Sequence, residues 1–140
     1  VRGWQGTLQV CTDIACVRSV VAAVCYHANE LAILTTARIW DATFEWQAHL
    51  PHALAAGIDQ AVVDALVADH DPDFSNDDEQ LVYEFSRELN LTRGVSDALY
   101  ARAIAILGEE GTVDLVGVLG YYSLISMTIK AFDVDPINAS

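Results

Sequence analysis

Apolar residues recur every three to four positions along most of the chain, which is the spacing of one face of an α-helix. The stretch 79–91 shows the pattern clearly, with Leu81, Val82, Phe85 and Leu89 at helical intervals. No stretch combines the strict alternation of a strand with hairpin turn residues, and no internal repeat is evident. The sequence therefore predicts an all-α fold, a bundle of about six to seven helices.

In the first part of the chain we expect a short helix within residues 1–10 and then one or two helices within residues 17–40. Asp41 can end this run and cap the next helix, which continues through Pro51. Because proline lacks an amide hydrogen, we expect this helix to be kinked there.

The next helix follows a short turn. Gly57 suits the left-handed end of the helix before it, and Asp59 can cap the new one, which should end before His70. Its residues expected to face the core are Val62, Val63, Leu66 and Val67.

Residues 70–78 are rich in acids and contain a proline, so they are predicted to form a loop. After the 79–91 helix, Ser96 can cap another helix that ends at Gly108. Thr112 then begins a long final helix that ends near Asp133.

The final helix is apolar on nearly every side. Its apolar run, 115–129, is interrupted by Gly, Ser and Thr and is shorter than the roughly 20 residues that span a bilayer, so we interpret it as a buried helix. A surface helix would keep a polar face, so the outer side of this one is expected to pack on another subunit.

Length and charge restrict the function. With 140 residues the chain, 1–140, fits a single domain. Its net charge of −13, with only seven Lys and Arg, argues against binding nucleic acid, which requires cations that replace the counterions of phosphate. The same charge disfavours an anionic membrane surface.

Cys11, Cys16 and Cys25 are odd in number and form no CxxC pair. Neither a disulfide framework nor a zinc site is indicated, so we expect reduced thiols and a cytoplasmic protein. The first residues do not resemble a signal peptide, and without an initiating Met we expect that residues before Val1 are missing.

The candidate chemistry is concentrated between residues 30 and 57. Glu45 and His49 lie four residues apart, so on a helix they share a face and can exchange a proton. Glu30, on the preceding segment, can reach the same pocket if the two helices pack antiparallel. The alternatives are an exposed ion pair for Glu45 and His49, and a helix-terminal carboxylate for Glu30.

Two motifs resemble one known family. They are ARIWDATFEWQAH at 37–49 and GYYSLI at 120–125, and they resemble carboxymuconolactone decarboxylase-like proteins, which share a helical fold with the alkylhydroperoxidase AhpD. The AhpD-like motif is a Glu followed by CxxCxxxH. Aligning its His with His49 and its helix-ending Gly with Gly57 places its Glu on Glu30 and its two Cys on Ala42 and Glu45.

Both thiols of the motif are therefore absent, as in the branch of the family with an EWxxH signature. The resemblance covers roughly residues 30–136 and implies a lyase that uses Glu30, Glu45 and His49 as acid–base groups on a small carboxylated lactone or related acid. It also implies a homo-oligomer, a trimer or hexamer, that uses no cofactor.

Four further residues are candidates for contact with a small-molecule substrate: Arg38, Trp46, Tyr121 and Tyr122. Arg38 could hold a carboxylate, although a structural ion pair is an equal alternative. A Tyr on an apolar helix is often a core residue, and the aromatic residues around Trp46 can form an apolar wall. His52 shares the face of Glu45 and His49, but three ligands on one kinked helix rarely converge, so no metal site is predicted.

Two other functions stay open. An alkylhydroperoxidase or peroxiredoxin activity, as in AhpD, needs a reactive thiol pair that Ala42 and Glu45 do not supply. A non-catalytic helical oligomer that binds a small ligand is the other alternative.

Overall fold

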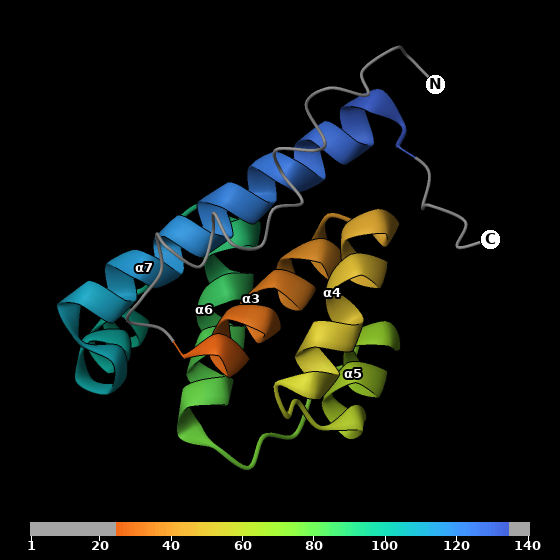
Figure 1. The fold of residues 1–140 in the computed structure, drawn as a ribbon. Helices are drawn as coiled ribbons and strands as arrows, with labels where there is room; N and C mark the ends of the chain where they lie inside the picture. The colour runs from red at the N-terminus through yellow and green to blue at the C-terminus, as the bar shows by residue number, and fades with distance from the viewer. Residues whose placement is uncertain (1–24, 135–140) are drawn as a thin grey trace.

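A computed structural model of the chain describes residues 25–134, and every regular element within that range is an α-helix (Figure 1). The prediction of an all-α fold is confirmed. The five helices are α3 (Tyr26–Ile39), α4 (Thr43–Ala55), α5 (Gln60–Val67), α6 (Asp77–Thr92) and α7 (Asp97–Phe132).

The count of six to seven helices was too high for this part of the chain. The two helices expected on either side of Gly108 are present as the two parts of α7, which meet at a kink and are counted as one element. The helix expected within residues 1–10 lies outside the described residues.

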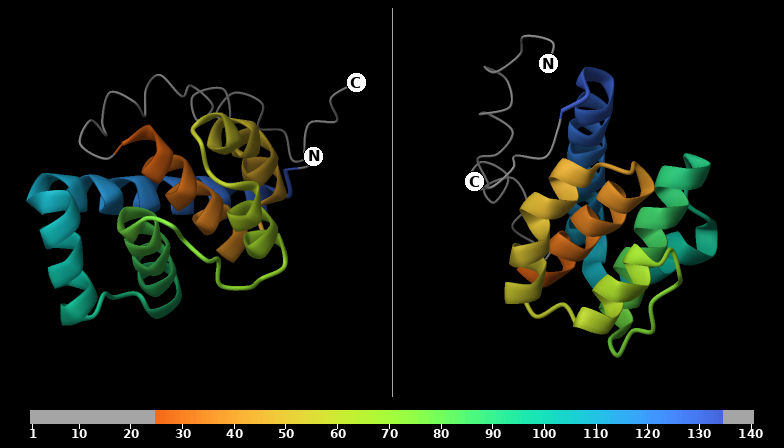
Figure 2. Two further views of the ribbon diagram at one scale, coloured as in Figure 1. Left: turned by 90° about the horizontal axis from the view of Figure 1, so that it is seen from below. Right: turned by 90° about the vertical axis from the view of Figure 1, so that its right-hand side faces the viewer.

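Helix α3 is the centre of the bundle. It packs on α4, α6 and α7, and it also contacts α5. Figures 1 and 2 show α4 and α6 on either side of α3 and α7 crossing them along one side. Nine of the fourteen residues of α3 are buried, so this helix has little surface exposed to solvent along most of its length. The largest fully buried apolar side chains of the core are Phe85, Leu31, Leu34, Leu81, Leu115 and Leu119.

Three of the predicted helix ends are confirmed. The Asp59 side chain accepts a hydrogen bond from the Ala61 N–H at 2.9 Å, and Ser96 accepts one from the Leu99 N–H at 3.4 Å. Gly57 follows α4 with φ of +98°, the left-handed region that costs glycine nothing.

The prediction that Asp41 caps α4 was wrong. The N-cap residue is Ala42, which has no side-chain cap, and Asp41 itself is left-handed with φ of +52°. Its carboxylate instead contacts the Lys130 ammonium at 3.2 Å, and Lys130 also donates to the Asp41 carbonyl oxygen at 3.2 Å. This contact ties the α3–α4 turn to the end of α7.

Gly108 interrupts α7, as the sequence indicated. Its φ of +73° and ψ of 177° lie outside the helical region, and the helix resumes immediately afterwards. The Thr112 hydroxyl donates to the Gly108 carbonyl oxygen at 2.7 Å. The helix then runs to Phe132 and ends at a left-handed Asp133, as predicted.

One expected core residue is exposed. Val67, the last residue of α5, has 57% of its surface exposed, whereas Val62, Val63 and Leu66 are buried as predicted. The helix has only eight residues, so its final turn extends past the core of the bundle. Helix α4 continues through Pro51 to Ala55.

Helix α7 is, within residues 25–134, the single helix long and apolar enough to cross a membrane. Length and composition are weak evidence for a span, because a core helix of a soluble protein has the same properties. One side of α7 is buried in the bundle, with Leu115, Leu119 and Ile125 in the core.

Candidate functional site

Glu30 and His49 meet in the interior between α3 and α4. The three-residue turn at 40–42 returns the chain so that the two helices pack together, and the His49 Nδ1 lies 3.0 Å from the Glu30 Oε2. Glu30 is 3% exposed and His49 is 8% exposed. The contact is therefore a buried hydrogen bond between a carboxyl group and an imidazole, and Glu30 is not the helix-terminal carboxylate considered as its alternative.

The geometry determines which His49 nitrogen is available for chemistry. A carboxylate accepts hydrogen bonds, so Glu30 holds the proton on Nδ1, and Nε2 is the nitrogen that can accept or deliver a proton. This is the orientation that a general acid–base histidine requires.

Glu45 lies one turn before His49 on α4 and is 2% exposed. The Ser126 hydroxyl, from α7, donates a hydrogen bond to the Glu45 Oε2. Burial raises the pKa of Glu45 to about 8, and the hydrogen bond from Ser126 opposes that rise. Glu45 is thus largely protonated at neutral pH, unlike an exposed carboxylate.

Tyr122 of α7 completes the group. Its ring lies edge-on to the His49 imidazole, with 5.0 Å between the ring centroids and an interplanar angle of 87°. Burial raises the pKa of Tyr122 above its ordinary value, and at the high pH where a phenol titrates the charges of Glu30 and Glu45 raise it further. Tyr122 therefore remains a neutral phenol.

Of the predicted site residues, Glu30 and Tyr122 contact His49 directly, whereas the hydrogen bond of Glu45 is to Ser126. Tyr121 contacts the Tyr122 ring, with 5.2 Å between the ring centroids, so the Tyr122 ring connects Tyr121 to His49.

Arg38 and Trp46 lie elsewhere. The Arg38 Nε donates to the Leu66 carbonyl oxygen at 2.9 Å, so the guanidinium binds the end of α5. Both residues line a separate cavity of about 260 Å³ beside Val67. A role for them in binding substrate stays a prediction, and it would have to operate at that cavity.

His52 lies near His49, with 6.2 Å between ring centroids. Within residues 25–134 no three His, Cys, Asp or Glu side chains are arranged to hold a metal ion.

The thiols contribute nothing to this cluster among the described residues. Cys25 is exposed and precedes α3 as its N-cap residue. Cys11 and Cys16 lie outside the described residues.

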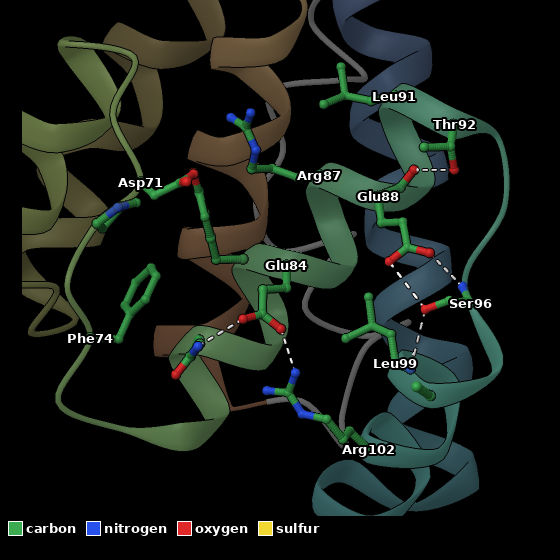
Figure 3. A pocket seen from close by; sticks show the side chains of 14 residues that line it. Asp71, Phe74, Glu84, Arg87, Glu88, Leu91, Thr92, Ser96, Leu99 and Arg102 are labelled. Carbon is green, nitrogen blue, oxygen red and sulfur yellow. Dashed lines mark hydrogen bonds and ion pairs between the residues drawn. The ribbon is translucent and has the colours of Figure 1, made fainter.

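A larger hollow of about 630 Å³ lies between α6 and the start of α7 (Figure 3). Its charged groups are mostly paired with one another: Arg102 binds Glu84, and Glu88 accepts from the Ser96 backbone N–H. Asp71 accepts from the Tyr83 hydroxyl at 2.8 Å. These contacts join α6 to its neighbouring segments and occupy the charged groups. This hollow is therefore a weaker candidate for a functional site than the cluster around His49.

Sequence reasoning missed Ser126. It is fully buried on α7, 81 residues from Glu45. In the sequence Ser126 is recognisable as a small polar residue on an apolar helix, but nothing in the spacing of neighbouring residues relates it to Glu45.

Comparisons of the chain with protein-family models, with curated proteins and with solved structures found no match in any of the three. The functional interpretation therefore depends on the geometry of this cluster and on the two sequence motifs.

Proposed function

We propose that the chain is an enzyme of proton transfer that resembles the carboxymuconolactone decarboxylases and acts on a small carboxylated lactone or a related acid. The observation that supports it is the buried Glu30–His49 hydrogen bond beside a second buried carboxyl group, Glu45. Two carboxyl groups and an imidazole removed from water at one place are typical of acid–base catalysis.

The chemistry accounts for these residues. When a carboxylate conjugated to a lactone carbonyl leaves as CO₂, the electrons of the broken C–C bond form a dienolate, whose charge is centred on the carbonyl oxygen. A protonated His49 then delivers its Nε2 proton to carbon, which restores the lactone carbonyl. The imidazole is neutral after this step and regains a proton from water, with Glu30 stabilising the cation.

A peroxidase activity like that of AhpD is less well supported. It requires a low-pKa thiolate and a resolving thiol, and the motif positions of this chain hold Ala42 and Glu45. Cys25, the one thiol among the described residues, is exposed at the start of α3.

We also propose that the chain self-associates through α7, in the cytoplasm. Six residues on one side of this helix form an exposed stripe that we call the α7 face: Val113, Val116, Gly117, Gly120, Leu124 and Met127. Exposed apolar surface of this kind is typical of subunit interfaces.

The test is turnover of carboxymuconolactone, followed as released CO₂. We expect the wild-type chain to release CO₂, and H49A and E30Q to lower kcat by about 100-fold or more, the range of general acid–base catalysis. H52A is the matched control, since it removes another imidazole of the same helix, 6.2 Å from the His49 ring centroid, whereas the imidazole that bonds Glu30 is that of His49; it should retain wild-type turnover.

Two results would contradict the proposal. One is an absence of CO₂ release from the wild-type chain. The other is hydroperoxide turnover that disappears in C25S, which would favour the AhpD-like activity. If the wild-type chain is inactive in both assays and binds a small acid equally well after H49A, a non-catalytic binding protein is favoured.

A further inference from the structure

The two oxygen atoms of the Glu45 carboxyl group differ in their contacts. Glu45 Oε1 is inaccessible to solvent and has no hydrogen-bond partner among the described residues, whereas Oε2 of the same carboxyl group accepts from Ser126. A buried polar atom without a partner is costly, so it calls for an explanation such as a catalytic role or a bound molecule.

The surroundings of Glu45 differ from those of Glu30. Glu30 faces the imidazole of His49, a partner that can be a cation. Glu45 faces neutral groups: the Ser126 hydroxyl on α7 binds it directly, and Tyr122, on the same helix, is a phenol. Burial disfavours an anion at Glu45, because the ionised carboxylate would lose its hydration there.

The two carboxyl groups are therefore suited to opposite protonation states. Glu30 works as a carboxylate that orients His49. Glu45, with one oxygen held by a hydroxyl donor and the other unpartnered, is suited to carry a proton on Oε1.

We propose that Glu45 is a neutral carboxylic acid that donates a hydrogen bond from Oε1 to a carbonyl oxygen of the substrate, and that Ser126 is the positioning residue that holds it in that orientation. This assignment deepens the proposed function and rests on it for the reaction. The recognised chemistry is an acceptor oxygen on which negative charge develops, such as the lactone carbonyl.

Glu45 and His49 then have different roles in the reaction. As CO₂ leaves, charge moves to the carbonyl oxygen, and the hydrogen bond from Glu45 becomes stronger while its proton stays on Glu45. His49 then protonates carbon, and the hydrogen bond weakens again. Glu45 is thus a donor in the transition state and not the source of the transferred proton.

The first experiment measures the protonation of Glu45 by infrared spectroscopy and needs no turnover. The difference between wild-type and E45Q spectra should contain the C=O stretching band of a protonated carboxyl group at pH 6, and the band should disappear as pH rises through about 8. In S126A the midpoint should rise by about one pH unit, because a donor to the ionised form is lost.

S123A is the control for the loss of a serine from α7. Ser123 donates to the Asn90 Oδ1 at 2.9 Å and does not contact Glu45, so its removal should leave the midpoint unchanged. If E45Q removes no such band at pH 6, the neutral acid is disproved. If the band is present but S126A does not move its midpoint, the role of Ser126 is disproved.

The second experiment separates a hydrogen-bond donor from a proton source. E45Q keeps an N–H donor, so we expect kcat/KM within about tenfold of wild type and no decline of activity near pH 8, whereas E45A should lose about 100-fold or more. Equal losses in E45Q and E45A would disprove the donor role. A wild-type chain that shows the infrared band but releases no CO₂ supports the neutral acid and contradicts the proposed reaction.

Discussion

At the scale of single residues, two carboxyl groups in one interior behave differently because their neighbours differ. Glu30 lies 3.0 Å from an imidazole nitrogen that can be positively charged. Glu45 has a hydroxyl group on one oxygen and no partner for the other among residues 25–134. Burial alone then favours the uncharged form of Glu45.

This difference predicts how stability depends on pH. In the unfolded chain Glu45 loses its proton near pH 4.5, and in the folded chain near pH 8. Between these values the unfolded state has lost a proton that the folded state keeps, so rising pH favours unfolding. Across this pH range the free energy of unfolding falls by up to about 5 kcal/mol because of Glu45, and above pH 8 the fall levels off.

Urea denaturation at several pH values, compared between wild type and E45Q, measures this contribution. The glutamine does not titrate, so the free energy of unfolding of E45Q should decline less than that of wild type between pH 5 and 8. The comparison cancels the other titrating groups. Parallel curves for the two proteins would show that Glu45 is ionised in the folded state.

The sequence predicted the residues of the site better than their contacts. The motif and the helical spacing placed Glu30, Glu45 and His49 together, because all three lie on two adjacent helices joined by a short turn. Ser126 could not be predicted this way, since its contact depends on how α7 docks. Arg38 shares α3 with Glu30, but its side chain extends to the carbonyl groups at the end of α5.

At the scale of elements, Gly108 determines the shape of α7. Its backbone, with φ of +73° and ψ of 177°, lies in a region that only glycine enters at low cost. This break lets the first part of α7 turn against α6 while the second part reaches the site with Tyr122 and Ser126.

Replacing Gly108 with alanine tests this role. An added Cβ would meet no atom within 4 Å, so any cost comes from the backbone conformation alone. We expect G108A to destabilise the fold by about 1–3 kcal/mol, measured by chemical denaturation.

The matched control is G117A. Gly117 is helical, and in the single chain an added Cβ would meet no atom within 4 Å, so alanine there should stabilise the protein by about 0.5–1 kcal/mol where the chain is monomeric. Equal effects of the two substitutions would mean that Gly108 adopts an ordinary helical conformation.

A capping side chain in the sequence predicted two helix starts correctly and one wrongly. Asp59 and Ser96 cap helices as expected because their side chains accept from an amide two or three residues later. Asp41 had the same chemistry, but Lys130 of α7 competes for its carboxylate. Only the tertiary structure contains that competitor.

At the scale of the whole molecule, the α7 face is a stripe of exposed apolar residues along one helix of the part of the chain that the structure describes. Val113 is 70% exposed and Leu124 58% exposed, and together with Met127 they lie on one side of the helix. The opposite side contains Tyr122 and Ser126. Association through the α7 face would therefore stabilise the helix that carries part of the site.

We expect the L124E substitution to convert an oligomer to monomers, measured as molar mass by light scattering during gel filtration, because a buried unpaired charge at an interface is costly. V67E is the control, since Val67 is equally exposed but lies on α5. A wild-type chain that is monomeric at micromolar concentration would disprove association through this face.

The bond between Ser126 and Glu45 also has a consequence for the order of folding. It joins residues 81 positions apart, whereas Glu30 and His49 are separated by 19. Loop closure makes distant pairs slower to form, so an intermediate with the α3–α4 hairpin would already hold the imidazole in place while Glu45 remained hydrated and ionised. The uptake of a proton by Glu45 would then report the docking of α7, and a pH indicator in a stopped-flow refolding experiment could follow that step directly.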